Sequence, residues 1–188
     1  RMIDAVKRLA ARCPDRLKLA GSAQEIRRIV GGGKVAGVLC VEGGHAIDDD
    51  LATLRLFHEL GVRYMTLTWN NSNNWADGCG GPMKHDGLTA FGREVVGEMS
   101  RVGMMVDLSH VAEKTFYDAL AVTAKPALVS HSCARALCDH RRNLRDDQLR
   151  AIAANGGVVC VNFYSCFLSD EFRMATAEFD ARRAAENE

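Results

Sequence analysis

KVAGVLCVEGG, residues 34–44, is the most informative stretch of the sequence, because an almost unbroken apolar run ends abruptly on Glu42 and two glycines. A short Val-rich run of this kind is typical of a β-strand that is buried on both faces. Such strands belong to parallel sheets whose faces are covered by helices. The sequence therefore predicts a parallel strand over residues 34–41 with Glu42 at its carboxyl end.

The same alternation of strand and helix extends outward from this run in both directions. Further strand-like apolar runs lie at 63–69, 103–110, 126–132 and 157–164. Segments with helical patterns or helix-prone composition lie at 2–13, 22–30, 48–60, 91–99, 111–122, 146–154 and 169–188. Strands that alternate with helices in this way predict βα units and a parallel sheet.

The number of these units favours a barrel. A (β/α)8 TIM barrel has eight units and typically about 250 residues. We therefore predict an α/β fold of TIM-barrel type with about five βα units, in one partial domain over residues 1–188 that lacks the first and last barrel strands. A doubly wound sheet is the alternative, but no G-x-G-x-x-G follows the first strand, which disfavours its nucleotide-binding form.

Composition and charge limit the classes of partner. The chain is 47% hydrophobic and 26% charged, as expected for a globular domain. Its 24 basic and 24 acidic side chains balance, so we expect no nucleic acid partner and favour a small, near-neutral substrate. No apolar run approaches the roughly 18 residues that cross a bilayer. The first residues lack a secretory signal pattern, which favours a cytoplasmic location, with a membrane-anchored or secreted parent as the alternative.

Three good metal ligands stand at the ends of three predicted strands, namely Glu42, His110 and His131. The carboxyl ends of parallel strands meet at one rim, so the fold would bring these side chains together. Two imidazoles can hold one zinc ion, and a shared carboxylate can fix the spacing of two ions. Each residue taken alone has another interpretation: a hydrogen-bonded structural histidine, or a charge at a helix N-terminus.

Neighbouring residues complete this hypothesis. Asp107, Ser109 and Ser132 are candidates to orient the two histidines by hydrogen bonds. Three other histidines lie in a helix or in polar loops, where we expect them at the surface: His58, His85 and His140. His45 lies three residues after Glu42 and is therefore close to the predicted centre.

Five short segments occur in the order VEGGH (41–45), VDLSH (106–110), VSHS (129–132), RRNLRDD (141–147) and VNFY (161–164). Together they resemble segments of the membrane dipeptidase family of zinc metallopeptidases, over residues 2 to 168. The resemblance implies a (β/α)8 barrel with two zinc ions that hydrolyses dipeptides, often including those with a carboxyl-terminal D-residue. It also implies that Glu42 bridges both ions, that His110 and His131 hold one of them, and that Arg142 binds the substrate carboxylate.

The sequence departs from the family pattern in three places. The family's H-x-D motif, which holds the other zinc, is absent from these 188 residues, and so is its late-strand aspartate. Only half of the ligand set is therefore present, and no proton-transferring residue is assigned. After Leu67-Thr68 many members carry a histidine that contacts the substrate, whereas this chain has Trp69. An indole donates one hydrogen bond and carries no charge, so we expect Trp69 to contact the substrate with altered specificity.

Two other functions remain open from the sequence. One is a non-catalytic or truncated relative that keeps the scaffold, which Trp69 and the missing H-x-D motif would suit. The other is a different metal-dependent amidohydrolase that acts on cyclic amides or esters. A partial barrel also has two unpaired sheet edges, which favours pairing of copies of the chain as a homodimer.

Overall fold

The computed structural model describes residues 1–186 and is built on two parallel sheets. The larger sheet has the order β3-β4-β5-β6-β7, so every strand lies beside its neighbour in sequence. Its strands are β3 (Leu39–Glu42), β4 (Val62–Thr66), β5 (Met105–Asp107), β6 (Leu128–Val129) and β7 (Val158–Val159). A parallel sheet in sequential order is the α/β arrangement of TIM-barrel type that the sequence predicts.

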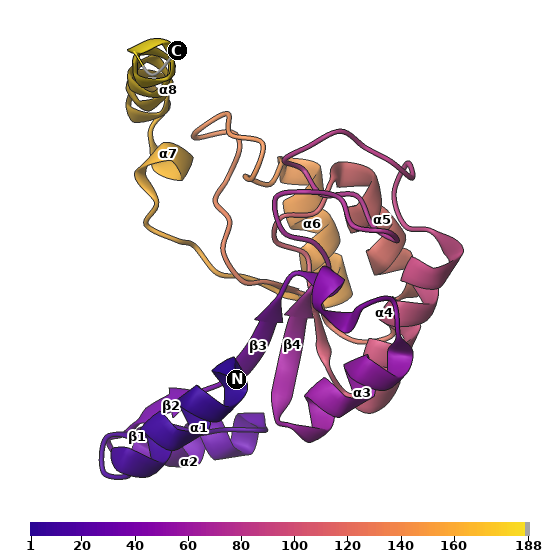
Figure 1. Ribbon diagram of the computed structural model, residues 1–188, viewed down its shortest axis with the longest axis vertical. Coiled ribbons are helices and arrows are strands. Elements are labelled where there is room, and N and C mark those ends of the chain that lie inside the picture. The colour runs from indigo at the N-terminus through magenta and orange to yellow at the C-terminus, as the bar shows by residue number, and fades with distance from the viewer. Residues whose placement is uncertain (187–188) are drawn as a thin grey trace.

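One helix precedes the first strand, and the others lie between strands or follow the last one. They are α1 (Met2–Arg12), α2 (Ala23–Gly31), the 3-10 turn η1 (Gly44–Ile47), α3 (Leu51–Glu59), α4 (Ala90–Val102), α5 (Glu113–Val122), α6 (Asp146–Asn155), α7 (Ser165–Leu168) and α8 (Asp170–Glu186). Helices α3 to α6 lie along one side of the larger sheet (Figure 1). Every helix predicted within the described residues is present, and residues 187–188 of the last one lie outside them.

The apolar run 34–41 does not form the single strand predicted from its sequence. Val38 separates β2 (Val35–Gly37) from β3, and the two strands belong to different sheets. Strand β2 pairs with β1 (Leu17–Leu19), whereas β3 pairs with β4. An apolar run does not encode its partner strand, so the break is invisible in sequence. Strand β1 is only three residues long, which is why no strand was predicted there.

The core lies between the larger sheet and its helices. Met65 of β4, Val95 and Met99 of α4, Phe116 of α5 and Val129 of β6 are all fully buried. Each large apolar side chain contributes about 1.5–3 kcal/mol when it is buried in this way. This core fixes the strands from the helix side and leaves their carboxyl ends as the rim that carries the polar residues.

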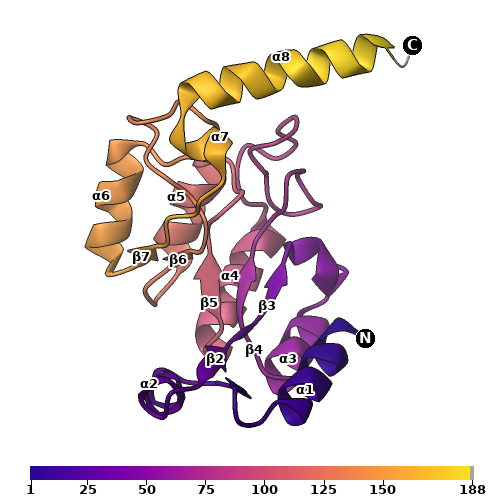
Figure 2. The ribbon, with the colours of Figure 1, turned by 90° about the vertical axis from the view of Figure 1, so that its left-hand side faces the viewer.

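The two terminal parts of the chain lie at opposite ends of the molecule (Figures 1 and 2). The unit α1-β1-α2-β2 lies beyond one end of the larger sheet, and α8 lies beyond the other. Helix α8 has no buried residue along Asp170–Glu186. None of the helices in residues 1–186 is long and apolar enough to cross a membrane.

Candidate metal centre

Glu42, His110 and His131 come together at the carboxyl rim of the sheet. Glu42 is the last residue of β3, His110 follows β5, and His131 follows β6. One ligand atom of each lies within 4.8 Å of the others. The Nε2 atoms of His110 and His131 are 3.2 and 3.3 Å from Glu42 Oε1. The parallel register has therefore collected three side chains that are far apart in sequence.

Both imidazoles are held in the neutral form. Burial is the main cause and, together with the nearby charge of Arg142, lowers the pKa of His110 to about 3. Burial, followed by Arg142, also lowers the pKa of His131 below its ordinary value. The indole of Trp69 stacks on the His110 ring with centroids 6.3 Å apart. Neutral imidazole offers a nitrogen lone pair, which is the form that binds metal.

His110 reaches its place through an unusual backbone conformation. Its φ angle is 69°, in the left-handed region that non-glycine residues rarely adopt. Its carbonyl oxygen accepts a 2.8 Å hydrogen bond from the Cys79 amide. Its Nδ1 atom lies 3.2 Å from Asn70 Oδ1. Asn70 and Cys79 both belong to the long segment between β4 and α4, so this segment folds back over the centre.

His131 is oriented by the sheet itself. Its Nδ1 atom lies 2.8 Å from Ser130 Oγ, and Ser130 Oγ donates a 2.6 Å hydrogen bond to Asp107 Oδ2. Ser109 Oγ accepts the His131 backbone amide at 3.0 Å. Asp107 and Ser109 thus lie in the predicted network. Ser132 also hydrogen-bonds His131, but its hydroxyl donates to the His131 carbonyl oxygen and not to the ring.

Ser130 was missed by the sequence analysis. Alternation along an extended strand suggests that a residue next to a ligand points to the other face. Here β6 ends at Val129, so Ser130 and His131 lie beyond the strand and need not alternate. The only sequence signal was the position of Ser130 in the segment VSHS.

A cavity of about 380 Å³ opens beside these three residues. The lining residues are Glu42, Trp69, Asn70, His110, His131, His140, Arg141, Arg142, Asn162, Tyr164 and Phe167. Trp69, predicted to contact substrate, is 48% exposed and therefore presents much of its ring to this space. Arg142, predicted to bind a carboxylate, lies between the metal-ligand candidates and Phe167, with its guanidinium 5.3 Å from that ring.

The Arg142 guanidinium has spare hydrogen-bonding capacity. Its Nη2 donates to the His131 carbonyl oxygen at 3.3 Å. Its Nε is buried and has no hydrogen-bond partner among the described residues. A guanidinium has five N–H donors, so its groups that face the cavity remain available to an acceptor from outside the chain.

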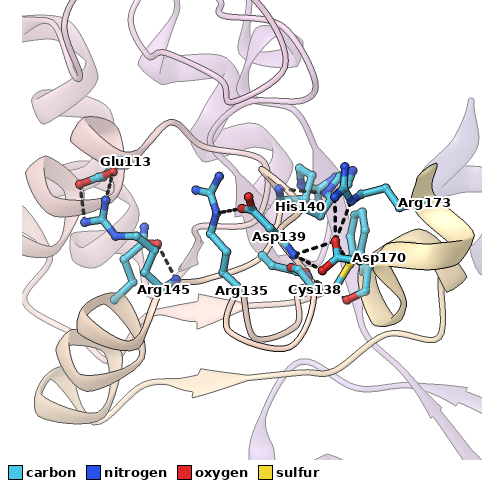
Figure 3. Close-up of polar contacts among 12 residues, drawn as sticks. Glu113, Arg135, Cys138, Asp139, His140, Arg145, Asp170 and Arg173 are labelled. Carbon is cyan, nitrogen blue, oxygen red and sulfur yellow. Dashed lines mark hydrogen bonds and ion pairs between the residues drawn. The ribbon is translucent and has the colours of Figure 1, made fainter. Parts of the chain in front are cut away.

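The loop that carries Arg142 is held at both ends (Figure 3). On one side Arg145 donates two hydrogen bonds to the Glu113 carboxylate, each of 2.5 Å. On the other side the Asp139 amide donates to Asp170 of α8 at 3.1 Å. Between them the Asn143 side chain donates to the carbonyl oxygens of Cys138 and Phe167. Arg142 is therefore presented from a fixed loop.

The remaining histidines lie outside the three-residue centre. His45 is exposed and lines a separate hollow with Asp48 and Asn74, so its proximity in sequence does not bring it to the centre. The predicted surface position of His140 is wrong, because its ring packs 4.5 Å from Phe167 and lines the cavity. His58 and His85 are also partly buried.

The donor set fits a metal ion. The Nε2 atoms of His110 and His131 face each other at 2.8 Å, and Glu42 Oε1 faces both. The Nδ1 atoms of both rings are engaged elsewhere, with Asn70 and Ser130. Two nitrogen lone pairs and a carboxylate converging on one point are best satisfied by a cation. Zinc binds this combination of ligands at about 2.0–2.2 Å.

The sheet and the donor set together define a metal-binding α/β domain of TIM-barrel type. The chain belongs to the membrane dipeptidase family, peptidase family M19, whose model matches residues 1–185. An uncharacterised dipeptidase of Schizosaccharomyces pombe is 46% identical over 170 residues, which cover 88% of this chain and 41% of that protein. Mouse Dipeptidase 3 is 43% identical over 164 residues, covering 85% of this chain and 32% of that protein.

Solved structures agree with this assignment. A Rhodobacter sphaeroides metallopeptidase, bound to a phosphinate mimic of the dipeptide L-Ala-D-Ala, has a TM-score of 0.84 and 35% identity, and the match covers 90% of this chain and 50% of that one. An amidohydrolase of Pseudomonas aeruginosa has a TM-score of 0.82 and 34% identity, covering 88% and 50%. The chain thus spans half or less of the length of these relatives.

Proposed function

We propose that this protein is a zinc-dependent dipeptidase in which Glu42, His110 and His131 are metal ligands. The observation that carries the proposal is the convergence of their ligand atoms to within 4.8 Å at the carboxyl rim of the sheet. Membership of the membrane dipeptidase family and the names of its relatives support the reaction. Because the chain spans half or less of those relatives, the activity is a hypothesis for the whole protein.

Glu42 is the residue best suited to serve two ions. Its contacts with both imidazoles are made through Oε1, and Oε2 is the atom that would serve a second zinc. The side chain is 49% exposed, so its second oxygen is accessible. A bound zinc supplies Lewis-acid polarisation of the peptide carbonyl and acidification of a water molecule. His110 and His131, held neutral, keep their lone pairs available at neutral pH.

Arg142 is proposed to hold the carboxyl terminus of the dipeptide. A guanidinium can donate two parallel hydrogen bonds to a carboxylate. Arg142 already lines the cavity beside Glu42. A substrate carboxylate there would accept from the guanidinium N–H groups that face the cavity. The same contact orients the peptide bond toward the metal ligands.

Trp69 is proposed to form the apolar wall of the substrate site. It lies between His110, on which it stacks, and the open cavity. Its ring can pack on an apolar substrate side chain, and its Nε1–H can donate one hydrogen bond. Acceptance of a carboxyl-terminal D-residue is part of this proposal. It is supported by the relative that binds a mimic of L-Ala-D-Ala.

The test is Glu42→Gln in the full-length protein. Glutamine keeps the size of the side chain but removes the negative charge that offsets the metal charges. We expect the wild-type protein to bind zinc and to hydrolyse L-Ala-L-Ala and L-Ala-D-Ala. We expect the variant to lose kcat/KM by at least about 100-fold, together with bound zinc measured by elemental analysis.

The matched control is His45→Gln, which removes a neighbouring histidine outside the centre and should leave hydrolysis unchanged. Unaltered turnover by Glu42→Gln would contradict the proposal. A wild-type protein that binds zinc but hydrolyses no dipeptide would favour a non-catalytic relative. Turnover of cyclic amides or esters in place of dipeptides would favour an amidohydrolase, the name of one structural relative.

A further inference from the structure

Asp107 is the centre of a buried hydrogen-bond network that joins three strands. Its side chain is 0% exposed. Oδ1 accepts the backbone amides of Ser109 and Ser130, at 3.1 and 2.9 Å. Oδ2 accepts the hydroxyls of Thr66 and Ser130, each at 2.6 Å. These donors come from the ends of β4, β5 and β6, so the carboxylate sets the relative position of the strands that carry the centre.

The hydrogen bonds of Ser130 determine which nitrogen of His131 carries the proton. A serine hydroxyl has one proton, and Ser130 uses it to donate to Asp107. Ser130 Oγ must therefore act as the acceptor in its 2.8 Å contact with His131 Nδ1. The neutral imidazole has one N–H, which this contact assigns to Nδ1. The lone pair is then on Nε2, the atom that faces Glu42 and His110.

Ser109 completes the network without conflict. Its Oγ accepts the His131 backbone amide, at 3.0 Å. Its own proton is then free to point toward Ser130 Oγ, 3.3 Å away. Ser130 Oγ thus has two donors and one acceptor, and every hydroxyl proton has a single role. If the Ser130 hydroxyl donated to His131 instead, no proton would lie between Ser130 Oγ and Asp107 Oδ2, and these two acceptor oxygens would repel each other.

We propose that Ser130 is a positioning residue that locks His131 in the Nδ1–H tautomer, with Asp107 fixing the direction of the Ser130 hydroxyl. Ser130 does not touch the metal or the substrate and acts only through His131. The role in metal binding rests on the proposed function, whereas the control of the tautomer does not. The carboxylate orients the imidazole through an intervening hydroxyl, a variation on the direct carboxylate–histidine contact of many zinc sites.

The tautomer is tested first, on protein freed of metal by chelation. Nitrogen NMR of ¹⁵N-histidine-labelled protein distinguishes the protonated from the unprotonated ring nitrogen, and the His131 signals are assigned by their loss in His131→Gln. We expect Nδ1–H for wild type and for Ser132→Ala, the matched control that removes a neighbouring hydroxyl. We expect Ser130→Ala to lose this preference and to show Nε2–H or a mixture.

Metal affinity is the second measurement. In a titration with Co²⁺, Ser130→Ala should bind the ion with a Kd that is roughly 10–100-fold higher than that of wild type. Its visible spectrum with Co²⁺ should also change. Ser130→Thr keeps the hydroxyl, so it should restore the wild-type Kd and spectrum. Ser130→Cys, whose thiol is a weak donor and acceptor, replaces the alanine variant if that one fails to fold by circular dichroism.

The outcomes separate the two proposals. A folded Ser130→Ala variant that keeps the Nδ1–H tautomer would overturn the role of Ser130. The role of Ser130 would also be overturned if His131 of the wild-type protein carried its proton on Nε2. The same holds if the Kd for Co²⁺ of Ser130→Ala stays within twofold of the wild-type value. If Ser130→Ala changes the tautomer as expected but the wild-type protein binds no metal, the proposed function is contradicted and the control of His131 by Ser130 stands.

Discussion

The Nε2 atoms of His110 and His131 lie 2.8 Å apart, and both face Glu42 Oε1. The Nδ1 atoms are occupied by Asn70 and Ser130, so the facing atoms carry lone pairs. Two imidazole lone pairs and a carboxylate that converge in this way form a donor set that favours a divalent cation among them.

Zinc should accordingly stabilise the protein. A ligand that binds only the folded state contributes about 2.7 kcal/mol at a free concentration of 100 times its Kd. We expect zinc to raise the Tm measured by calorimetry and a chelator to reverse the rise. His131→Gln should abolish the effect, while His45→Gln, outside the centre, should keep it. An equal rise in Tm for His131→Gln would show that zinc binds elsewhere.

Arg142→Lys should weaken substrate binding more than it slows the reaction. Lysine keeps the charge but cannot donate two parallel hydrogen bonds from one plane. We expect KM for dipeptides to rise by roughly 10-fold or more, equivalent to about 1.4 kcal/mol, with a smaller change in kcat. Arg150→Lys, an exposed position on α6, is the control.

A second substrate makes the Arg142 prediction specific. Wild-type protein should discriminate strongly between a dipeptide and the same dipeptide with an amidated carboxyl terminus. Arg142→Lys should reduce this discrimination, because the contact that distinguishes the two substrates is weakened. Undiminished discrimination in the variant would assign carboxylate recognition to another residue.

Trp69 should report occupation of the cavity. The chain has two tryptophans, of which Trp69 is 48% exposed and Trp75 is fully buried. A dipeptide mimic that packs on Trp69 should shift its fluorescence emission to shorter wavelength, since water is removed from the ring. Trp69→Phe should abolish the shift and keep most of the binding, and Trp69→Ala should weaken binding by roughly 10-fold. A shift that survives in Trp69→Phe would place the mimic elsewhere.

Asp77 should make the segment between β4 and α4 sensitive to acid. Its buried carboxylate accepts the amides of Lys84, His85 and Gly87 at 2.7, 3.1 and 3.0 Å. Burial alone would raise the pKa of Asp77, but these three hydrogen bonds lower it below its ordinary value. Because the pKa of Asp77 is lower in the folded than in the unfolded chain, the carboxylate adds to the free energy of unfolding at pH values above about 3.8. This contribution is lost as the pH falls below that value.

The measurement is unfolding by urea at pH 7 and pH 3. Asp77→Asn places an NH2 group against backbone donors, so we expect a loss of about 1–3 kcal/mol at pH 7. The difference from wild type should shrink at pH 3, because below the ordinary pKa near 3.8 the unfolded wild-type chain takes up a proton at Asp77 and unfolding becomes more favourable. A difference that is independent of pH would show that the charge of Asp77 is unimportant.

Gly44→Ala should be destabilising because Trp75 leaves no room for a methyl group. A Cβ atom at Gly44 would lie 2.3 Å from Cζ2 of Trp75 and 2.6 Å from the Leu67 carbonyl oxygen. Overpacking of this kind costs typically about 1–3 kcal/mol. Gly97→Ala on α4 is the control, because nothing lies within 4 Å of its Cβ. For Gly97→Ala we expect the free energy of unfolding to rise by about 0.5–1 kcal/mol, because alanine has the higher helix propensity. Similar changes in stability at both positions would contradict the packing argument.

The features that sequence predicts here are those that depend on pattern alone. Five apolar runs gave five strands of the larger sheet, and polar residues at their ends gave Glu42, His110 and His131. Because the strands are parallel, residues at their carboxyl ends lie next to one another at one rim of the sheet, although they are far apart in sequence. That is why three distant residues could be grouped without any local motif.

The features that sequence did not predict depend on partners. The predicted strand breaks at Val38 because β2 pairs with β1 in the smaller sheet, whereas β3 pairs with β4 in the larger one. The apolar run by itself is compatible with either sheet. Ser132 was chosen over Ser130 because no pattern gives the direction of a hydroxyl just beyond a strand. His140 was placed at the surface because its contact with Phe167 joins a loop to helix α7, two segments that are well separated in sequence.

The left-handed conformation of His110 has a consequence for the rate of metal capture. A non-glycine residue in this region costs about 1–2 kcal/mol, and here the Cys79 amide holds it in place. This hydrogen bond is made by the main chain itself and can hold the angle whether or not an ion is bound. Association of the metal then requires no rearrangement of the main chain, so its kinetics should be single-exponential and limited by the exchange of water from the ion. A protein that had to flip this residue on binding would show a second, slower phase.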